Sequence, residues 1–233
     1  MPVLGRLGAL WRYPFKSMLG EALARAGVGP LGIYGDRGWA LREANGKNGS
    51  AKRHAALLSC SAAYTDEPDA DRNPPVSISL PDGRVLRSDS PAAAAALSQL
   101  LGRPMTLDDS PGAHFDDAPI HLVTSASLAE MRRRCPGADF DARRFRPNLV
   151  IDGAPAGLPE LAWRGQRLRV GGCEFSVRKP TKRCVMTTLA QEELPQDARI
   201  LQSIVDESDA ALGVYLDVTL PGELALNDPV ELI

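Results

Sequence analysis

The sequence predicts a mainly β protein of the α+β class, an antiparallel barrel or sandwich with a few helices. Short alternating or apolar runs recur along the chain, separated by turn signals rich in glycine, proline and aspartate. This spacing is typical of antiparallel sheets. Stretches with the apolar spacing and capping signals of a helix are fewer.

Four segments predict the strands. VSISL at 76–80 meets Pro-Asp-Gly and then RVLRS, which is the pattern of a hairpin. The other three are a short strand, NLVI, closed by Asp-Gly within 144–153; two or three strands turning at Gly165 and at Gly171-Gly172 within 161–177; and a strand, a Pro-Gly turn and a closing strand within 213–233.

Three segments predict helices. The stretch 90–102 begins with a serine cap and a proline at the first helical position, and it ends near glycine. A second helix, also with a serine cap, is predicted over 125–135, and a third over 195–208, where isoleucine, leucine and valine recur at helical spacing. The charged, proline-rich stretch 65–75 predicts a mobile surface loop.

Length and composition bound the class of protein. A chain of 233 residues that is 44% hydrophobic has core enough for one large domain or two small ones. The net charge of −2 argues against a dedicated nucleic-acid or membrane-surface binder. No run approaches the roughly 18 apolar residues of a membrane span. Arg6 and Arg12 interrupt the apolar core that a signal peptide needs, so we expect a cytoplasmic protein without membrane association.

Charge is distributed unevenly along the second half of the chain. Residues 141–184 carry ten Arg or Lys and four Asp or Glu, whereas residues 192–233 carry ten Asp or Glu and one Arg. We favour the interpretation in which the two segments neutralise each other on a common surface. The alternative is a basic segment that lines an anion site.

The four cysteines are isolated thiols. Cys60, Cys135, Cys173 and Cys184 include no C-x-x-C pair, which excludes zinc-ribbon and four-cysteine iron–sulfur motifs. Without a secretion signal, a disulfide framework is not expected. The histidines are also scattered, and no Ser or Cys partner motif accompanies His121, which is predicted to be hydrogen-bonded rather than catalytic.

Cys184 lies in the stretch KPTKRCVMTT, residues 179–188. Lys179, Lys182 and Arg183 place three cations close to this thiol in the sequence. Nearby cations favour the thiolate, which is the form of cysteine that binds metals. Two threonines, Thr187 and Thr188, offer hydrogen bonds to an oxo group or an anion. The alternative is a buried cysteine that acts as a small apolar side chain.

Four other segments offer donors for an anion. YPFKS (13–17) and YGDRGW (34–39) place lysine, serine and arginine at turns, LVTSASL (122–128) opens a helix with hydroxyl groups, and RRFRPNLV (143–150) holds arginine and asparagine beside a proline. Helix N-termini and arginine forks both suit phosphate. Each segment alone is weak evidence, because a lone arginine in a turn is usually solvated.

In order, these segments resemble the MOSC family, the proteins related to the C-terminal domain of molybdenum cofactor sulfurases. The shared motifs are Y-P-x-K-S, G-D-R-x-W, F-D-D-A-P-I-H-L-V-T-S-A-S-L, F-R-P-N-L-V-I-D-G, W-x-G, R-C-x-x-T-T and P-G-E-L-x-x-x-D-P-V, and they run from about residue 3 to 233. The branch resembled contains the mitochondrial amidoxime reducing component and bacterial N-hydroxylated-base reductases. The resemblance implies a MOSC-type β-barrel (101–233) after a smaller N-terminal β-barrel-like region (1–100), with a cofactor in the cleft between them.

That cofactor is the molybdenum cofactor, molybdenum held by molybdopterin with a terminal phosphate. By resemblance Cys184 is the single protein ligand of the metal and the catalytic residue. A soft thiolate suits a molybdenum centre that is already ligated by sulfur. The resemblance assigns the cofactor-binding residues as Lys16, Ser17, Arg37, Thr124, Ser127, Arg146, Asn148, Arg183 and Tyr215, of which the first three match positions that hold the pterin and its phosphate.

The implied activity is that of a molybdenum-dependent oxidoreductase, which reduces N-hydroxylated small molecules. The chain departs from the reductases at Thr181, where many carry a further cysteine, and it shows no iron–sulfur cluster motif. Electrons would therefore come from a separate donor protein of the ferredoxin, flavoprotein or cytochrome b5 type. Two alternatives stay open: a carrier of the molybdenum cofactor, and a sulfur-transfer protein with a persulfide on Cys184, both without redox turnover.

Overall fold

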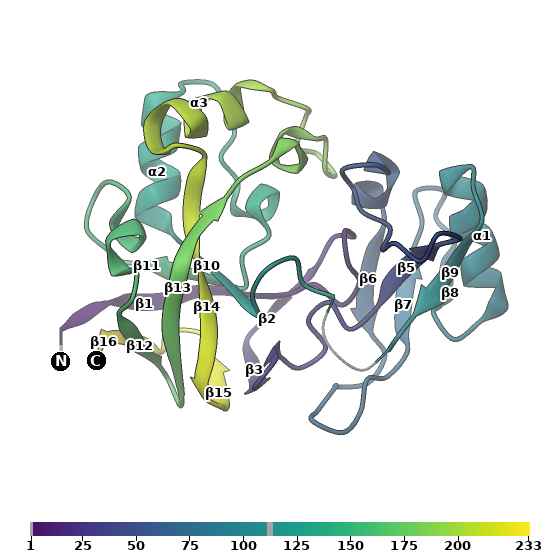
Figure 1. Cartoon of the computed structure of the whole chain (residues 1–233), viewed down its shortest axis with the longest axis horizontal. Helices are drawn as coiled ribbons and strands as arrows, with labels where there is room; N and C mark the ends of the chain where they lie inside the picture. Colours follow the sequence, from purple (N-terminus) through teal and green to yellow (C-terminus); the bar gives the residue numbers. More distant parts are fainter. Residues whose placement is uncertain (1, 111–113) are drawn as a thin grey trace.

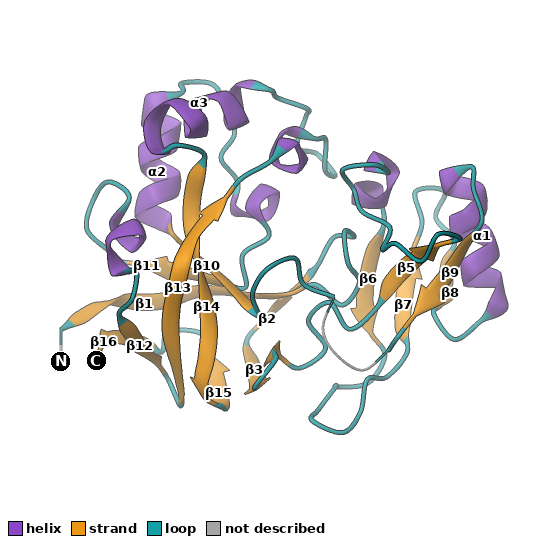
Figure 2. Cartoon of the chain, viewed as in Figure 1, coloured by secondary structure: helices purple, strands orange, loops and turns teal. Residues whose placement is uncertain are grey.

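The computed structural model describes residues 2–110 and 114–233, and strands dominate this part of the chain (Figures 1 and 2). The strands are β1 (Val3–Arg12), β2 (Glu21–Leu23), β3 (Arg25–Gly29), β4 (Gly32–Ile33), β5 (Ala40–Glu43), β6 (Ser61–Tyr64), β7 (Val76–Ser79), β8 (Val85–Arg87), β9 (Met105–Asp108), β10 (Ile120–Thr124), β11 (Leu149–Asp152), β12 (Arg167–Val170), β13 (Cys173–Lys182), β14 (Ala211–Leu220), β15 (Gly222–Ala225) and β16 (Pro229–Leu232). The α-helices are α1 (Pro91–Leu101), α2 (Ser125–Arg134) and α3 (Arg199–Ser208), and short 3₁₀ helices span Ala55–Ser59, Ala142–Phe145, Pro159–Trp163 and Val185–Thr188. The mainly β prediction is confirmed.

Seven strands form a closed barrel in the order β11-β10-β14-β13-β12-β16-β1, and β11 pairs back onto β1 to close it. The long strand β1 makes closure possible, because its first residues pair with β16, its middle with β11 and its end with β2. The first strand of the chain is thus part of a barrel whose other strands follow residue 119. Side chains such as Leu7, Leu122, Ile151 and Phe175 fill its core.

The outer face of the barrel is covered by α2 and α3 (Figure 1). Successive strand residues point to opposite faces of a sheet, so Leu122 enters the barrel core while Val123 packs outside it. On that outer face Val123 shares a buried cluster with Met131 of α2 and Ile204 of α3. The helices therefore pack against the outside of the parallel β10–β11 pair.

A second core belongs to the N-terminal region. The sheets β6-β7-β8 and β5-β9 pack with α1 around buried side chains that include Phe15, Leu41, Ile78 and Leu97. The predicted hairpin is confirmed as β7 and β8, and α1 is capped by Ser90 as predicted. The third sheet, β15-β3-β4, pairs residues 222–225 of the C-terminal part with residues 25–28.

Some predicted elements differ in detail from the observed ones. The first part of 161–177 is not a strand but the end of the 3₁₀ helix Pro159–Trp163. Helix α2 is capped by Thr124 rather than by a serine, and α3 begins at Arg199, whose backbone N–H is held by the Asp197 carboxylate. Residues 65–75 form neither strand nor helix. Within the ranges described, no helix combines the length and the apolar character that a membrane span requires.

Candidate functional site

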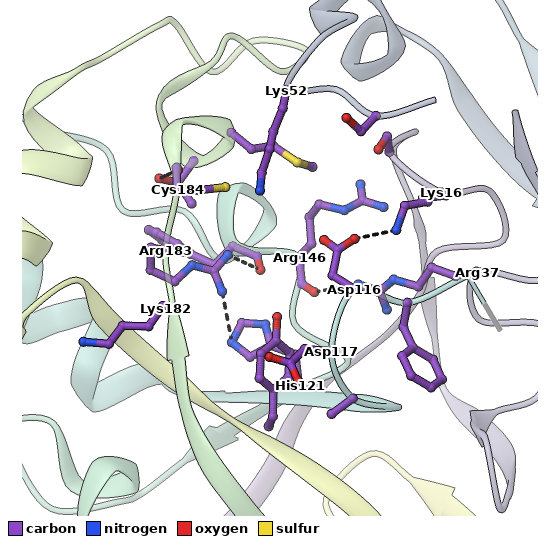
Figure 3. Close-up of a pocket in the computed structure, with 18 of the residues that line it drawn as sticks. Lys16, Arg37, Lys52, Asp116, Asp117, His121, Arg146, Lys182, Arg183 and Cys184 are labelled. Atoms are coloured by element: carbon purple, nitrogen blue, oxygen red, sulfur yellow. Dashed lines mark hydrogen bonds and ion pairs between the residues drawn. The ribbon is translucent and has the colours of Figure 1, made fainter. Parts of the chain in front are cut away.

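A cavity of about 1200 Å³ lies between the barrel and the N-terminal region. Figure 3 shows its wall, to which segments far apart in the sequence contribute. Eight of the ten predicted site residues line it: Lys16, Ser17, Arg37, Arg146, Asn148, Arg183, Cys184 and Tyr215. The cleft that the resemblance implied therefore exists, and it gathers residues from five of the quoted motifs.

Arg37 and Arg146 form a cationic stack with Tyr13. Their guanidinium carbons lie 4.7 and 4.2 Å from the centroid of the Tyr13 ring. Burial raises the pKa of Tyr13 to about 12 against the opposing effect of both arginines, so its hydroxyl is neutral at physiological pH. That hydroxyl donates to the backbone carbonyl of Pro147. Tyr13 was not singled out from the sequence, although it opens the Y-P-x-K-S motif.

Both arginines, and Ser17, have left-handed backbone conformations. Their φ angles are 51° for Arg37, 52° for Arg146 and 69° for Ser17. Non-glycine residues seldom adopt this region, and such strain often accumulates at functional sites. In this conformation Arg146 ends the 3₁₀ helix Ala142–Phe145, and its side chain reaches the cavity wall (Figure 3).

Asn148 links the arginine stack to the barrel. Its fully buried side-chain oxygen accepts from Arg37 Nη1 at 3.2 Å and from the backbone N–H of His121 at 3.1 Å. Its amide nitrogen donates to the Trp11 carbonyl at 3.2 Å. Because one amide side chain connects β1, β10 and the Arg37 turn, its position fixes the relative placement of three parts of the wall.

Arg183 is held by His121 and by the backbone. Its Nη2 donates to the Phe145 carbonyl at 2.8 Å, and its Nη1 lies 3.4 Å from His121 Nε2. Burial, with the charge of Arg183, lowers the pKa of His121 well below its usual range. The neutral ring must then accept at Nε2 and carry its proton on Nδ1. Sequence reasoning predicted a hydrogen-bonded His121 without its partner.

Gly213 on β14 makes room for the His121 ring. A Cβ atom at this glycine would lie 2.4 Å from His121 Nε2, and the residue has a φ of +81°. The next residue but one, Tyr215, faces His121 across the strands with ring centroids 5.8 Å apart. The pairing of β10 with β14 thereby brings His121, Tyr215 and Arg183 together at one wall of the cavity.

Cys184 lies on the cavity wall at the point where β13 ends. Its side chain is half-buried, and its residue caps the 3₁₀ helix Val185–Thr188. The hydroxyls of Thr187 and Thr188 donate to the backbone carbonyls of Cys184 and Val185 at 3.0 and 2.7 Å. The two threonines therefore stabilise the turn that carries the thiol, instead of offering their hydroxyl protons to the cavity.

Lys16 is paired with an acid inside the cavity. Its Nζ donates to Asp116 at 2.5 Å and to the His114 carbonyl at 2.6 Å. Burial would raise the pKa of Asp116, but the charges of Lys16, Arg37 and Lys52 lower it. Asp116 is part of the quoted F-D-D-A-P motif, yet its pairing with Lys16, 100 residues away, could not be inferred from spacing.

Thr124 and Ser127 are not among the residues that line this cavity. Both hydroxyls donate to the same oxygen of Glu160, at 2.8 and 2.6 Å, and all three side chains are fully buried. Burial raises the pKa of Glu160. The N-terminus of α2 was predicted to bind an anion. In the structure its hydroxyl groups donate to the carboxyl group of Glu160, a residue of the same chain.

The basic segment 141–184 is partly neutralised by the acidic segment 192–233 and partly lines the cavity. Arg143 forms ion pairs with Glu192 and Glu193, and Lys182 pairs with Asp209, so part of the basic segment is neutralised by the acidic one. Arg146 and Arg183 instead line the cavity without a carboxylate partner in the described ranges. Arg146 Nη2 and Arg183 Nε are buried and have no hydrogen-bond acceptor there. Unsatisfied buried donors of this kind suit an anionic or polar ligand.

Comparisons with known proteins agree with this arrangement. The family model described as MOSC domain matches residues 103–231, and the one described as MOSC N-terminal beta barrel domain matches residues 4–106. Among solved structures, the YUAD protein from Bacillus subtilis aligns over 98% of this chain and 94% of its own, with a TM-score of 0.54 at 14% identity. That likeness supports the fold.

Two sequence relatives match nearly the whole chain, and a third matches part of it. Mitochondrial amidoxime reducing component 2 of Homo sapiens is 24% identical over 97% of this chain and 83% of its own length. Mitochondrial amidoxime-reducing component 1 of Mus musculus is 25% identical over 99% and 83%. A stretch of molybdenum cofactor sulfurase 2 of Culex quinquefasciatus, 10% of that protein, is 39% identical to 31% of this chain. The chain belongs to the MOSC domain family.

Proposed function

We propose that this protein binds the molybdenum cofactor in the cavity and uses it to reduce N-hydroxylated small molecules. One observation carries the proposal: the Cys184 thiol shares a cavity with Arg146 and Arg183, each of which has one buried nitrogen without an acceptor in the described ranges. A thiolate is a soft ligand suited to a sulfur-ligated metal. Arginine forks are suited to a phosphate. The two ends of the cofactor would thus meet matching residues.

The size and charge of the cavity support the same assignment. Pockets for ligands of ordinary size measure about 300–1,000 Å³, and this one, at about 1200 Å³, has room for a cofactor and a small substrate together. Burial and repulsion from Arg37 lower the pKa of Arg146 to about 10. A bound phosphate would relieve both effects, because it brings negative charge to a buried like-charged pair.

Each residue has a role in this proposal. Lys16, Ser17, Arg37 and Arg146 anchor the cofactor through its phosphate, Asn148, Arg183 and Tyr215 orient the pterin, and Cys184 ligates the metal. When bound, the cofactor supplies two-electron redox chemistry. The overall reaction takes two electrons and two protons, breaks the N–O bond of the substrate, and leaves an N–H group and water. The chain supplies binding, orientation and electrostatic tuning. The electrons come from a separate donor protein, of the ferredoxin, flavoprotein or cytochrome b5 type.

The relatives support a reductase rather than a carrier. Those that match over almost the whole chain are named for the reduction of amidoximes, which are N-hydroxylated compounds. The similarity to a molybdenum cofactor sulfurase is confined to a third of this chain. We therefore place both alternatives, the cofactor carrier and the sulfur-transfer protein, after the reductase.

The test compares two half-buried cysteines. Cys184 and Cys135 are both half-buried, but Cys135 is not among the residues that line the cavity. Cys184→Ser, Cys135→Ser and the parent protein are expressed in a host that makes the cofactor. Molybdenum and pterin contents are then measured, together with reduction of benzamidoxime by a reduced viologen dye. The parent and Cys135→Ser should hold stoichiometric molybdenum and reduce the compound, and Cys184→Ser should lose both properties.

Other outcomes would identify the alternatives. A molybdenum-loaded parent that reduces no amidoxime or hydroxylamine, but transfers its cofactor to an apo-enzyme, would be a carrier. An extra sulfur atom on Cys184, found by mass spectrometry of freshly isolated protein, would support sulfur transfer. A parent that holds no molybdenum even after addition of free cofactor would refute both the reductase and the carrier proposals.

A further inference from the structure

The cavity carries more positive charge than its acidic residues neutralise. Twelve lysines and arginines line it, and six of them have an Asp or Glu partner within 4.0 Å: Lys16, Arg37, Arg42, Arg53, Lys179 and Lys182. The other six have none in the ranges that the structure covers: Lys47, Lys52, Arg144, Arg146, Arg164 and Arg183. This surplus is larger than the cofactor phosphate alone would require.

Three of the six are accounted for by their surroundings. Arg144 is buried and donates to the carbonyls of Asp139, Leu189 and Pro195. Arg146 and Arg183 are the buried donors assigned above to the cofactor. The side chains of Lys47, Lys52 and Arg164 are instead exposed while still lining the cavity. They therefore form its rim, where they would meet whatever enters from solvent.

Among the labelled side chains of the cavity, Lys52 extends toward the side where Cys184 lies. Figure 3 shows its side chain extending from the N-terminal region to the side where Cys184 lies, whereas Lys16 and Arg37 lie on the other side. Lys52 and Asp116 both line the cavity, and the charge of Lys52 is one of the cationic charges that lower the pKa of Asp116.

The backbone around Lys52 is held on both sides. Ala51 before it is fully buried, and the N–H groups of Arg53 and His54 both donate to the Ser50 carbonyl at 2.9 Å. Arg53 is further tied to Glu43 and to the Asn48 carbonyl, each at 2.6 Å. A hydrogen-bonded turn therefore holds the backbone of Lys52 at the rim. The Lys52 ammonium group has no carboxylate partner in the described ranges, so its charge is available for a ligand.

We propose that Lys52 selects N-hydroxylated substrates that carry an anionic group, a carboxylate or a phosphate. This inference rests on the proposed function and adds the charge class of its substrate. A cation at the mouth of a cleft raises the local concentration of anions and attracts the charged end of a substrate whose N–O group faces Cys184. Because Lys52 is exposed, one such contact should change kcat/KM by about fivefold, the scale of a solvent-exposed charge pair.

The experiment uses the molybdenum-loaded protein, a viologen donor and two compounds that differ by one charge. Benzamidoxime is neutral at pH 7, and its para-carboxy derivative is an anion. The parent should prefer the anion, and Lys52→Met should lower the ratio of kcat/KM values, anion over neutral, by about fivefold and mainly through KM. Lys52→Arg should retain the preference. In about 1 M salt, where the Debye length is about 3 Å, the preference of the parent should largely disappear.

The matched control is Arg25→Met. Arg25 is exposed on β3 and is not among the residues that line the cavity, so the variant removes one positive charge elsewhere. Its ratio of kcat/KM values should equal that of the parent. Equilibrium titration of both compounds into the loaded protein without donor gives a second readout, in which Lys52→Met should weaken binding of the anion alone.

Three results would overturn the inference. A parent that reduces the two compounds equally well would have no charge preference to explain. A Lys52→Met variant that loses the same factor with both compounds would show a general role. If Lys52→Met lowers kcat/KM only when a protein donor replaces the viologen, Lys52 belongs to the docking site of an acidic electron donor. In each case benzamidoxime is still reduced by the parent, so the proposed function stands. Failure of loaded parent protein to reduce either compound would refute both.

Discussion

Arg146 lies over the ring of Tyr13, with its guanidinium carbon 4.2 Å from the ring centroid. Arg37 contacts the same ring at 4.7 Å. Two buried like charges repel each other, and burial itself disfavours both. The electron-rich face of the ring compensates in part, because cation–π contacts are strongest where water is excluded. Tyr13 is therefore the platform on which two cations are held ready for a multiply charged anion.

Tyr13→Leu should destabilise the protein more than Tyr13→Phe does. The leucine removes both cation–π contacts and much buried ring surface, a loss of about 2–4 kcal/mol in the free energy of unfolding. The phenylalanine retains the ring and loses only the hydrogen bond to the Pro147 carbonyl, about 1 kcal/mol. Urea denaturation of the three proteins measures this. Equal losses in both variants would mean that the hydroxyl, not the ring, holds the two arginines.

Arg146→Met should separate cofactor binding from stability. Relief of charge burial and of repulsion from Arg37 offsets the lost hydrogen bond to the Met18 carbonyl, so the free energy of unfolding should change by less than about 1 kcal/mol. Pterin and molybdenum retained after dialysis should fall at least about tenfold, since a charge-assisted bond to phosphate is lost. A variant that keeps its cofactor but unfolds more readily would contradict this assignment of Arg146.

Ser127→Ala tests whether the hydroxyl group at the start of α2 binds cofactor or supports the fold. It removes a buried hydrogen bond to Glu160 and leaves that carboxyl with fewer donors, so the free energy of unfolding should fall by about 1–3 kcal/mol. Molybdenum content per folded molecule should equal that of the parent. The measurements are thermal unfolding and metal analysis of the folded fraction. Lost molybdenum at full stability would return Ser127 to the set of cofactor ligands that the resemblance implies.

Acidification should destabilise the protein through His121. Its pKa in the folded state lies well below the value of about 6.5 for an unfolded chain. As the pH falls below about 6.5, the unfolded chain therefore binds a proton that the folded state resists. The loss is at most about 1.4 kcal/mol per pH unit for one proton. His114, whose pKa is also lowered by burial, contributes in the same direction.

The comparison that isolates this effect is the parent against His121→Gln, followed by urea denaturation from neutral to mildly acidic pH. The glutamine oxygen can still accept from Arg183 but cannot be protonated, so the slope of stability against pH should be smaller in the variant. Glu160 opposes the trend in both proteins, because its raised pKa gives stability that is lost as the pH rises. Identical slopes would assign the acid sensitivity to other groups.

The family order of their motifs grouped Lys16, Arg37, Arg146 and Cys184 in one site, and the four residues line one cavity. Their roles toward a cofactor stay predictions. Sequence reasoning did not anticipate that Thr124 and Ser127 would lie elsewhere. A helix N-terminus rich in hydroxyl groups looks open to an anion when read locally. The carboxyl group that takes this position belongs to Glu160, more than thirty residues away.

The sequence by itself determined the features that depend on neighbours in the chain. Caps and turn residues specified α1 and the β7–β8 hairpin, and the spacing of four cysteines left Cys184 as a single thiol among cations. Tertiary structure alone decided which cations remain unpaired. Closure of β1 on β11, the contact of Arg146 with the Tyr13 ring, and the position of Lys52 on the Cys184 side of the cavity all join segments more than about 100 residues apart. Burial and charge pairing arise from such contacts, and no local pattern records them.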